Sequence, residues 1–233
     1  MTQSRLKSGD VVDVGPARVR LAVNARARRI GLRIAADGEV VATAPSARSL
    51  PQALAFARDR SSWITERLKA RPAGATLEPG AIIPLRGAPT RLEVAPGRGA
   101  ARLEPGGIVS GGEGETYARR VLRLLQAEAR ADLAAATARY AAALGRPAPK
   151  LSLTDARTRW GSCSPARGAV RYSWRLVLAP PAVLDYVAAH EVAHLVEANH
   201  SPRFWAVVTR LYGDPRAARA WLKADGAALH AVG

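Results

Sequence analysis

The chain has 233 residues, of which 48% are hydrophobic, and its 35 Lys and Arg against 19 Asp and Glu give a formal net charge of +16. This length and hydrophobic content predict one large or two small globular domains. The single cysteine excludes an internal disulfide bond, and no apolar run is long enough to span a bilayer. Since residues 1–5 also lack a hydrophobic signal core, we expect a cytoplasmic protein with no membrane partner.

Arginine carries almost all of the positive charge, because only four residues are lysine. A GC-rich genome explains the choice of Arg over Lys, but it does not explain the excess of cations over anions. The excess leaves open a nucleic acid or nucleotide partner that contacts a basic surface. One cluster, Arg26-Ala27-Arg28-Arg29, is either a solvated edge that discourages aggregation or a patch that contacts phosphates.

The N-terminal part of the chain has the pattern of a small sheet followed by a helix. Residues 17–45 alternate apolar and polar side chains, with a hairpin turn predicted at Asp37-Gly38. From Ser49 onward apolar residues recur at helical spacing, and this predicts a helix that ends before Pro72.

A stretch rich in Gly and Pro, residues 71–114, predicts short strands and turns. A long Ala- and Leu-rich helix is predicted from Thr116 to Leu144, where Gly and Pro follow and stop it. We place a domain boundary in this region, with a β-rich subdomain containing one helix in residues 1–110 and a second domain in residues 111–233.

Two strand-like segments, residues 151–154 and 169–177, come next in the chain. Cys163 lies between them, and a lone cysteine of this kind is expected to be a small buried residue instead of a nucleophile or a ligand. A further helix is predicted to begin near Pro181, because proline fits the first turn of a helix.

Three of the four histidines lie within residues 190–200, which also contain Glu191 and Glu197. His190 and His194 form a His-Glu-x-x-His pattern, and on a helix they share one face, one turn apart. This spacing predicts two ligands of a catalytic zinc ion. Glu191 lies on the flank of that face, where it can reach a water on the metal without coordinating it, and is the candidate general base. His230 lacks the spacing of a ligand and is expected at the surface.

Glu197 and His200 are the candidates for the third ligand. A continuous helix would point Glu197 along its axis, whereas His200 requires the helix to end first. Asn199 tolerates the left-handed conformation that ends a helix, and Ser201-Pro202 has the pattern of an N-cap and first residue of the next one. We favour His200. A structural zinc site would usually add a fourth protein ligand, and the sequence near the motif offers none.

The predicted site supports hydrolysis. Three neutral imidazoles leave zinc its 2+ charge and one open position, which lowers the pKa of bound water from about 9 toward about 7. Glu191 would take the proton as this water attacks a carbonyl. The sequence therefore predicts a zinc-dependent metallopeptidase that acts on a peptide or protein substrate.

Two other classes of function stay open. One is a metal-dependent nucleotide phosphohydrolase, in which the arginines neutralise phosphate oxygens. The chain shows no phosphate-cradling glycine loop, which weighs against it. The other is a nucleic-acid-associated binding protein with a vestigial metal site, against which the intact Glu191 argues.

Four ordered segments resemble the YgjP-type family of metallopeptidase-like proteins, which are related to the SprT and WLM zincins. The segments are Arg159–Ser164, Trp174–Pro181, Tyr186–Glu191 and Asn199–Trp205. The metzincins share the histidine spacing but need a methionine turn, and the only methionine here is Met1. The resemblance implies peptidase activity with Zn²⁺ and an α+β fold. In that fold a zincin-like domain, with a small antiparallel or mixed sheet and an active-site helix, follows the β-rich subdomain.

Zincins place a strand beside the metal, and an extended peptide can add to the free edge of such a strand. Val170–Trp174 is our candidate for this edge. Trp160 is a candidate wall of the substrate cleft, and Arg171 and Tyr172 are candidate substrate contacts. With Arg159, the last two are also candidates for stabilising the oxyanion.

Overall fold

The computed structural model describes residues 6–34, 38–69, 75–156 and 159–233, and it is a mixed α+β protein as expected. Contacts divide the chain into two units, Met1–Pro72 and Ala73–Gly233. Our expected boundary lay between residues 110 and 111. The division comes earlier because Ile83, Leu92 and Ile108 are fully buried in the same core as the long helix that follows them.

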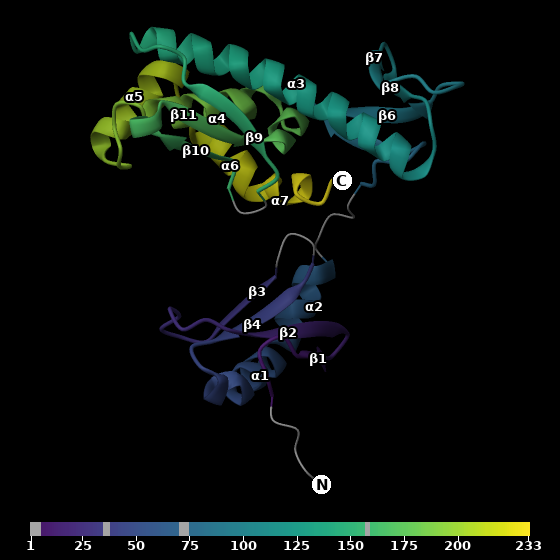
Figure 1. The fold of residues 1–233 in the computed structure, drawn as a ribbon. Coiled ribbons are helices and arrows are strands. Elements are labelled where there is room, and N and C mark those ends of the chain that lie inside the picture. Colours follow the sequence, from purple (N-terminus) through teal and green to yellow (C-terminus); the bar gives the residue numbers. More distant parts are fainter. Residues whose placement is uncertain (1–5, 35–37, 70–74, 157–158) are drawn as a thin grey trace. The chain divides into compact units, whose positions relative to one another are not determined.

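The first unit is a four-stranded sheet with two helices (Figure 1). Its strands have the order β1-β2-β4-β3, in which β2 and β4 are parallel and the outer pairs are antiparallel. The elements are β1 (Val11–Val14), β2 (Ala17–Val23), β3 (Gly31–Ile34), β4 (Val40–Ala44), α1 (Leu50–Asp59) and α2 (Ser61–Lys69). The predicted sheet is confirmed, while Asp37 of the predicted turn lies outside the described residues. The single predicted helix is two helices, which meet at Arg60.

The second unit begins with a small sheet of order β5-β6-β8-β7, followed by a long helix. The elements are β5 (Ile82–Leu85), β6 (Ala88–Val94), β7 (Arg102–Glu104), β8 (Gly107–Ser110) and α3 (Gly114–Ala143). The predicted long helix is confirmed, and Gly145 follows it with a φ of +64°, the left-handed conformation that ends helices.

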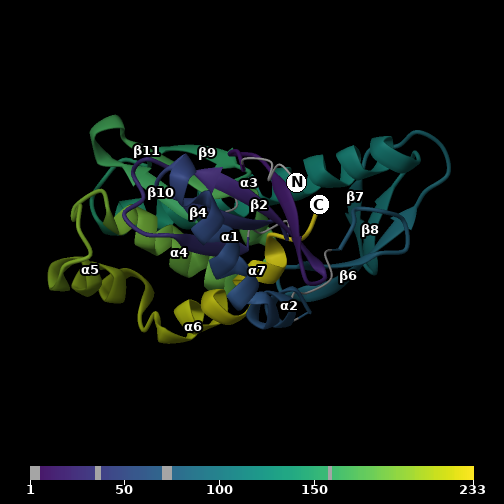
Figure 2. The same cartoon turned by 90° about the horizontal axis from the view of Figure 1, so that it is seen from below.

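The remainder of this unit contains a three-stranded sheet and four helices, of which α4 packs against α3 and α5 and α6 pack against α4. The elements are β9 (Lys150–Thr154), β10 (Gly161–Ser164), β11 (Ala169–Ser173), α4 (Pro181–Ala193), α5 (Pro202–Tyr212), α6 (Arg216–Ala224) and α7 (Gly226–Leu229). Within this unit, α5 lies at the opposite end from β7 and β8 (Figures 1 and 2). The helix predicted to begin near Pro181 begins at that residue.

The strand order β10-β11-β9 corrects one expectation. We expected the segment Val170–Trp174 to form a free edge, but β11 is the central strand. It pairs antiparallel with β10 and parallel with β9. Val170 and Tyr172 of this strand are fully buried, while Arg171 between them is exposed. Within the described residues, the edges are β10 and β9.

The β5–β6 hairpin helps to fix the start of α4. Its two turn residues, Arg86 and Gly87, have φ values of 51° and 77°, as a two-residue hairpin turn requires. Their N–H groups donate to the carbonyls of Val177 and Leu178 at 2.7 and 3.1 Å. A Cβ at Gly87 would lie only 3.0 Å from the Cα of Pro180, which directly precedes α4. The hairpin is thus held against the entry to this helix.

No helix in the described part of the chain combines the length and the apolar character that crossing a bilayer requires.

Candidate metal centre

Helix α4 brings two histidines to the same side. Proline occupies its first position, where the missing N–H group costs no hydrogen bond. Most of its residues are buried, including Ala188, Ala189 and Val192, while His190 remains half-buried. The helix ends at Ala193, and His194 follows as its C-cap with helical φ and ψ of −64° and −15°. The ring centroids of the two histidines are therefore 5.1 Å apart.

The helix ends earlier than we expected. Asn199 does not adopt a left-handed conformation. In the described ranges, Arg86 is the one non-glycine residue with positive φ. The chain instead leaves the helix through turns after His194, with the Glu197 N–H donating to the Ala193 carbonyl at 3.0 Å. The cap of the next helix is as predicted, since the Ser201 hydroxyl accepts from the Phe204 N–H at 3.4 Å.

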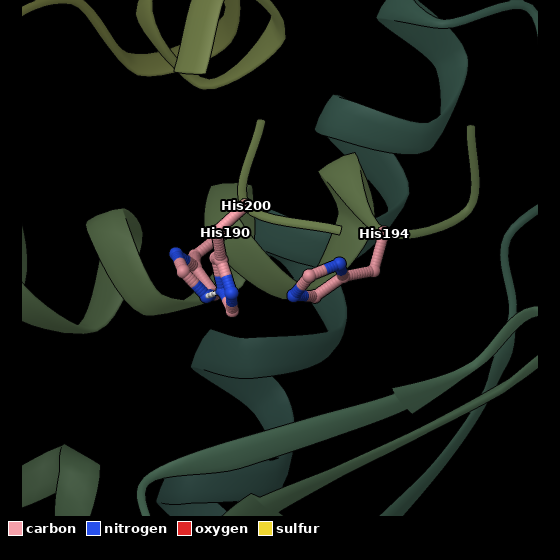
Figure 3. Close-up of side chains that lie close together, drawn as sticks. All are labelled: His190, His194 and His200. Atoms are coloured by element: carbon pink, nitrogen blue, oxygen red, sulfur yellow. Dashed lines mark hydrogen bonds between the residues drawn. The ribbon is translucent and has the colours of Figure 1, made fainter. Parts of the chain in front are cut away.

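This break in the chain places the ring of His200 beside the rings of His190 and His194 (Figure 3). One ring nitrogen from each residue lies within 4.8 Å of the other two. The Nε2 atoms of His190 and His200 are 3.0 Å apart. Two nitrogens on a tetrahedral zinc ion at 2.0–2.1 Å would be about 3.3 Å apart, so small movements of the side chains suffice to hold the ion.

The other ring nitrogens have partners that orient the rings. His194 Nδ1 lies 3.0 Å from the backbone carbonyl of Glu197, so this nitrogen carries the proton and Nε2 is left with a free lone pair. His190 Nδ1 lies 3.4 Å from the hydroxyl of Tyr186. Hydrogen bonds of this kind are typical of histidines that bind metal.

Burial favours the neutral forms of His190 and His194, which are the forms that bind a metal ion. The pKa of His190 falls to about 4, first because the ring is removed from water and then because His194 and His200 lie beside it. Burial also lowers the pKa of His194, against the hydrogen bond to the Glu197 carbonyl. Within the described residues, these three side chains form the cluster that has enough ligands for a metal ion.

Glu191 is buried beside strand β10. Its exposed fraction is 6%, and removal from water raises the pKa of its carboxyl group to about 7, while the nearby charge of Arg159 acts in the opposite direction. A Cβ on Gly161 would lie 2.6 Å from both Cγ and Oε1 of Glu191. The carboxylate therefore occupies the space that any other side chain at residue 161 would fill.

Aromatic side chains surround the histidines. Phe204, at the start of α5, is fully buried, and its ring centroid lies 4.5–4.9 Å from those of all three histidines. Trp205 lies 5.9 Å from His190 and 6.0 Å from His200. The guanidinium of Arg219 covers the Trp205 ring at 4.6 Å. Helices α5 and α6 thus form one wall of the cluster.

The candidate substrate contacts are not brought together. Trp160 stacks on His230 with ring centroids 4.2 Å apart, which buries His230 and corrects our expectation that it lies at the surface. Arg171 is exposed on the central strand β11. Tyr172 is fully buried, and its hydroxyl lies 3.1 Å from that of Thr137 in α3. It therefore has no exposed surface with which to contact a substrate.

Cys163 of β10 is partly buried, and burial raises the pKa of its thiol to about 11, with the charge of Glu191 adding to the effect. It is therefore a neutral thiol, as expected for a residue that is not a nucleophile.

Reasoning from the sequence missed two residues of the site. Gly161 and Tyr186 both fall within the segments that carry the family resemblance, and this was the available signal. The clearance that Gly161 provides depends on which side chain packs against it from another element. Tyr186 contacts His190, which lies four residues later on the same helix. We applied this spacing only to the histidines.

One of three comparisons with known proteins found a match. The model of one family, described as a YgjP-like metallopeptidase domain, matches residues 28–225. The comparisons with curated proteins and with solved structures gave no match. The matched range contains the three histidines, Glu191 and Gly161, together with most of the first unit.

Proposed function

Because the chain belongs to the YgjP-like metallopeptidase family, we propose that it hydrolyses peptide bonds with a zinc ion held by His190, His194 and His200. The family itself implies a hydrolase of the metallopeptidase type that uses a divalent metal. The choice of zinc rests on the donors, since three neutral imidazoles with an open fourth position are typical of catalytic zinc. The convergence of the three ring nitrogens is the observation that carries the proposal, and Glu191 directly follows the ligand His190 in the chain.

Each side chain has a distinct part in this reaction. The ion, when bound, supplies Lewis acidity toward the substrate carbonyl and lowers the pKa of water at its open position. Glu191 accepts a proton from the attacking water and returns it to the leaving amine. A carboxylate with a pKa near 7 suits both transfers, because proton transfer is most effective when the pKa lies near the working pH. Arg159, whose charge lies near this carboxylate, is our candidate for stabilising the oxyanion that forms on the substrate carbonyl.

Strand β10 is the proposed substrate-binding edge. It is an edge strand within the described residues, and its first residue, Gly161, lies against Glu191. An extended peptide that adds to this edge through main-chain hydrogen bonds would carry its scissile carbonyl past the carboxylate. This assignment replaces β11, which has neighbours on both sides.

The test is to change Glu191 to Gln and to measure both metal content and peptide hydrolysis. The substitution keeps the size of the side chain but removes its ability to accept a proton, so we expect about one equivalent of zinc to remain while kcat/KM falls by about 10² to 10⁴. Changing His190 or His194 to Ala should remove the zinc. The matched control is Glu66→Gln on α2, which should change neither quantity. Normal turnover by the Glu191→Gln protein would refute the role of this carboxylate.

A nucleotide phosphohydrolase is the alternative, and no observation favours it. The described residues contain a single three-ligand cluster, whereas many phosphatases use two metal ions. A panel of nucleoside triphosphates, assayed beside unfolded protein substrates, separates the two activities. Phosphate release without proteolysis would favour the alternative.

A further inference from the structure

The first unit contains a pocket lined by apolar, aromatic and arginine side chains. We call it the arginine–aromatic pocket, and its volume is about 240 Å³. It is lined by Ile30, Gly31, Leu32, Phe56, Arg60 and Trp63. Trp63 is 37% exposed, which is unusual for a residue of this size. The pocket is large enough for one planar ring system.

The pocket lies between an open strand edge and two helices. Strand β3 is the last strand in the order β1-β2-β4-β3, so within the described residues it has a partner on one side only. Phe56 comes from α1 and Trp63 from α2. The guanidinium of Arg60 lies 5.6 Å from the Phe56 ring centroid, and that of Arg67 lies 6.0 Å from the Trp63 centroid. Flat π-surfaces and flat cations are thus presented together.

Positive charge is concentrated in this unit. Residues 1–72 contain 14 Lys and Arg against 6 Asp and Glu, so less than a third of the chain holds half of the net charge of +16. Three of these arginines, Arg26, Arg28 and Arg29, lie in the segment that leads directly into Ile30 of the pocket, and all three are exposed. A short basic segment therefore directly precedes the lining of the pocket.

Among the residues that the structure describes, few of these cations form ion pairs. In the described residues of this unit, Arg20 forms an ion pair with Glu39. Arg26, Arg28, Arg29, Arg60 and Arg67 make no ion pair with any described residue. Asp59 and Glu66 are the acidic residues of the two helices, and both are exposed. Most of the positive charge around the pocket is therefore available to an external anion.

We propose that the arginine–aromatic pocket and the segment Arg26–Arg29 bind single-stranded nucleic acid. In this mode a nucleobase stacks in the pocket against the exposed ring of Trp63, and the arginines contact the phosphates on either side. Aromatic stacking combined with a basic surface is how proteins bind single strands without reading their sequence. A duplex keeps its bases stacked on one another and offers no free base to the pocket.

Charge selects this occupant over other candidates. The remaining residues, 73–233, also carry a net positive charge, so neither they nor a second copy of the chain complement the surface. An acidic peptide satisfies the charge but supplies no array of flat rings at the spacing of its anions. The proposal is independent of the zinc chemistry, because Trp63 belongs to a different unit from the three histidines.

The test uses the full chain and fluorescein-labelled dT and rU 12-mers in anisotropy titrations. If three to four phosphates are contacted, the logarithm of the binding constant should fall against the logarithm of salt concentration with a slope of about −2 to −3. The fluorescence of the full chain, which has five tryptophans, should be partly quenched on binding, and this quenching should be lost in the Trp63→Leu protein. The dT and rU arms distinguish DNA from RNA.

Two variants separate stacking from charge. Trp63→Leu keeps the pocket apolar and should weaken binding about five- to tenfold or more, because it removes one stacked base. Arg28→Gln with Arg29→Gln should reduce the salt slope by about 1.4. The matched control is Arg119→Gln with Arg123→Gln on α3, which removes the same charge from exposed positions of the second unit and should have a smaller effect. Circular dichroism, which should not change, verifies that each variant is folded.

Other outcomes would overturn the proposal. Equal binding by the Trp63→Leu protein would show that no base stacks in the pocket. Equal binding of a duplex or of a poly-glutamate peptide would show a surface that attracts any polyanion. A similar loss in the α3 control and in the Arg28→Gln/Arg29→Gln protein would place the contact elsewhere.

Discussion

At the scale of single residues, the position of Glu191 depends on the absence of a side chain at residue 161. The carboxylate is almost fully buried, and it gains that position from the space above the Gly161 Cα. Gly161 has an ordinary strand backbone, since its φ is not positive. Its requirement for glycine is therefore one of space and not of backbone conformation.

Changing Gly161 to Ala should displace the carboxylate more than it destabilises the fold. The new Cβ would come within 2.6 Å of Glu191, and the end of a flexible side chain moves more easily than backbone does. We expect kcat/KM for peptide hydrolysis to fall by about 10²-fold, as a misplacement of about 1 Å does, with zinc retained. The matched control is Gly106→Ala, which meets no atom within 4 Å. Full activity in the Gly161→Ala protein would contradict this account of the contact.

Tyr186 should contribute to metal affinity through His190. Changing it to Phe removes the hydroxyl that lies 3.4 Å from His190 Nδ1 and leaves the ring in place. We expect the affinity for zinc, measured by competition with a chromophoric chelator, to fall about tenfold. Tyr212→Phe is the control, because that hydroxyl donates to the Ala182 carbonyl and not to a histidine. Equal zinc affinities in the two variants would show that Tyr186 only packs.

At the scale of secondary structure, the sequence predicted helices and their caps better than it predicted which strands pair. The long helix, the start of α4 and the cap at Ser201 follow from residues close in sequence, and all three were predicted. The place of β11 in its sheet depends on which distant strands pair with it, and sequence patterns do not reveal this order. The end of α4 was also misjudged, because turn hydrogen bonds end the helix without a left-handed residue.

The cap at Ser201 links the start of α5 to the position of His200. Changing Ser201 to Ala removes the acceptor for the Phe204 N–H, and we expect a loss of about 0.5–1 kcal/mol in the free energy of unfolding. Because His200 directly precedes the cap and is exposed, zinc affinity should fall about two- to fivefold. Denaturant titration and chelator competition measure the two effects. Ser49→Ala is the control, since Ser49 caps α1 without a side-chain bond to the helix. An unchanged zinc affinity would separate the cap from the metal centre.

At the scale of the whole chain, two hydrophobic cores correspond to the two units. One core contains buried residues of the first sheet with α1 and α2, and the other contains residues from Leu77 to Val232. The sequence predicted a β-rich part followed by a second part, but it placed the boundary at the compositional change near residue 110. The sheet of β5 to β8 is equally rich in turns, yet its buried side chains belong to the second core, and only the packing of distant residues decides this.

Separate cores predict two thermal transitions, only one of which responds to zinc. The first unit has the smaller core and should melt at the lower temperature, because a domain of its size buries a smaller fraction of its surface. Zinc at about 100 times its Kd should stabilise the second unit by about 2.7 kcal/mol and raise its Tm by roughly 5–10 °C. Differential scanning calorimetry with and without zinc makes the measurement, and the His194→Ala protein is the control that should show no shift. A single transition that moves as a whole with zinc would mean that the two cores unfold together.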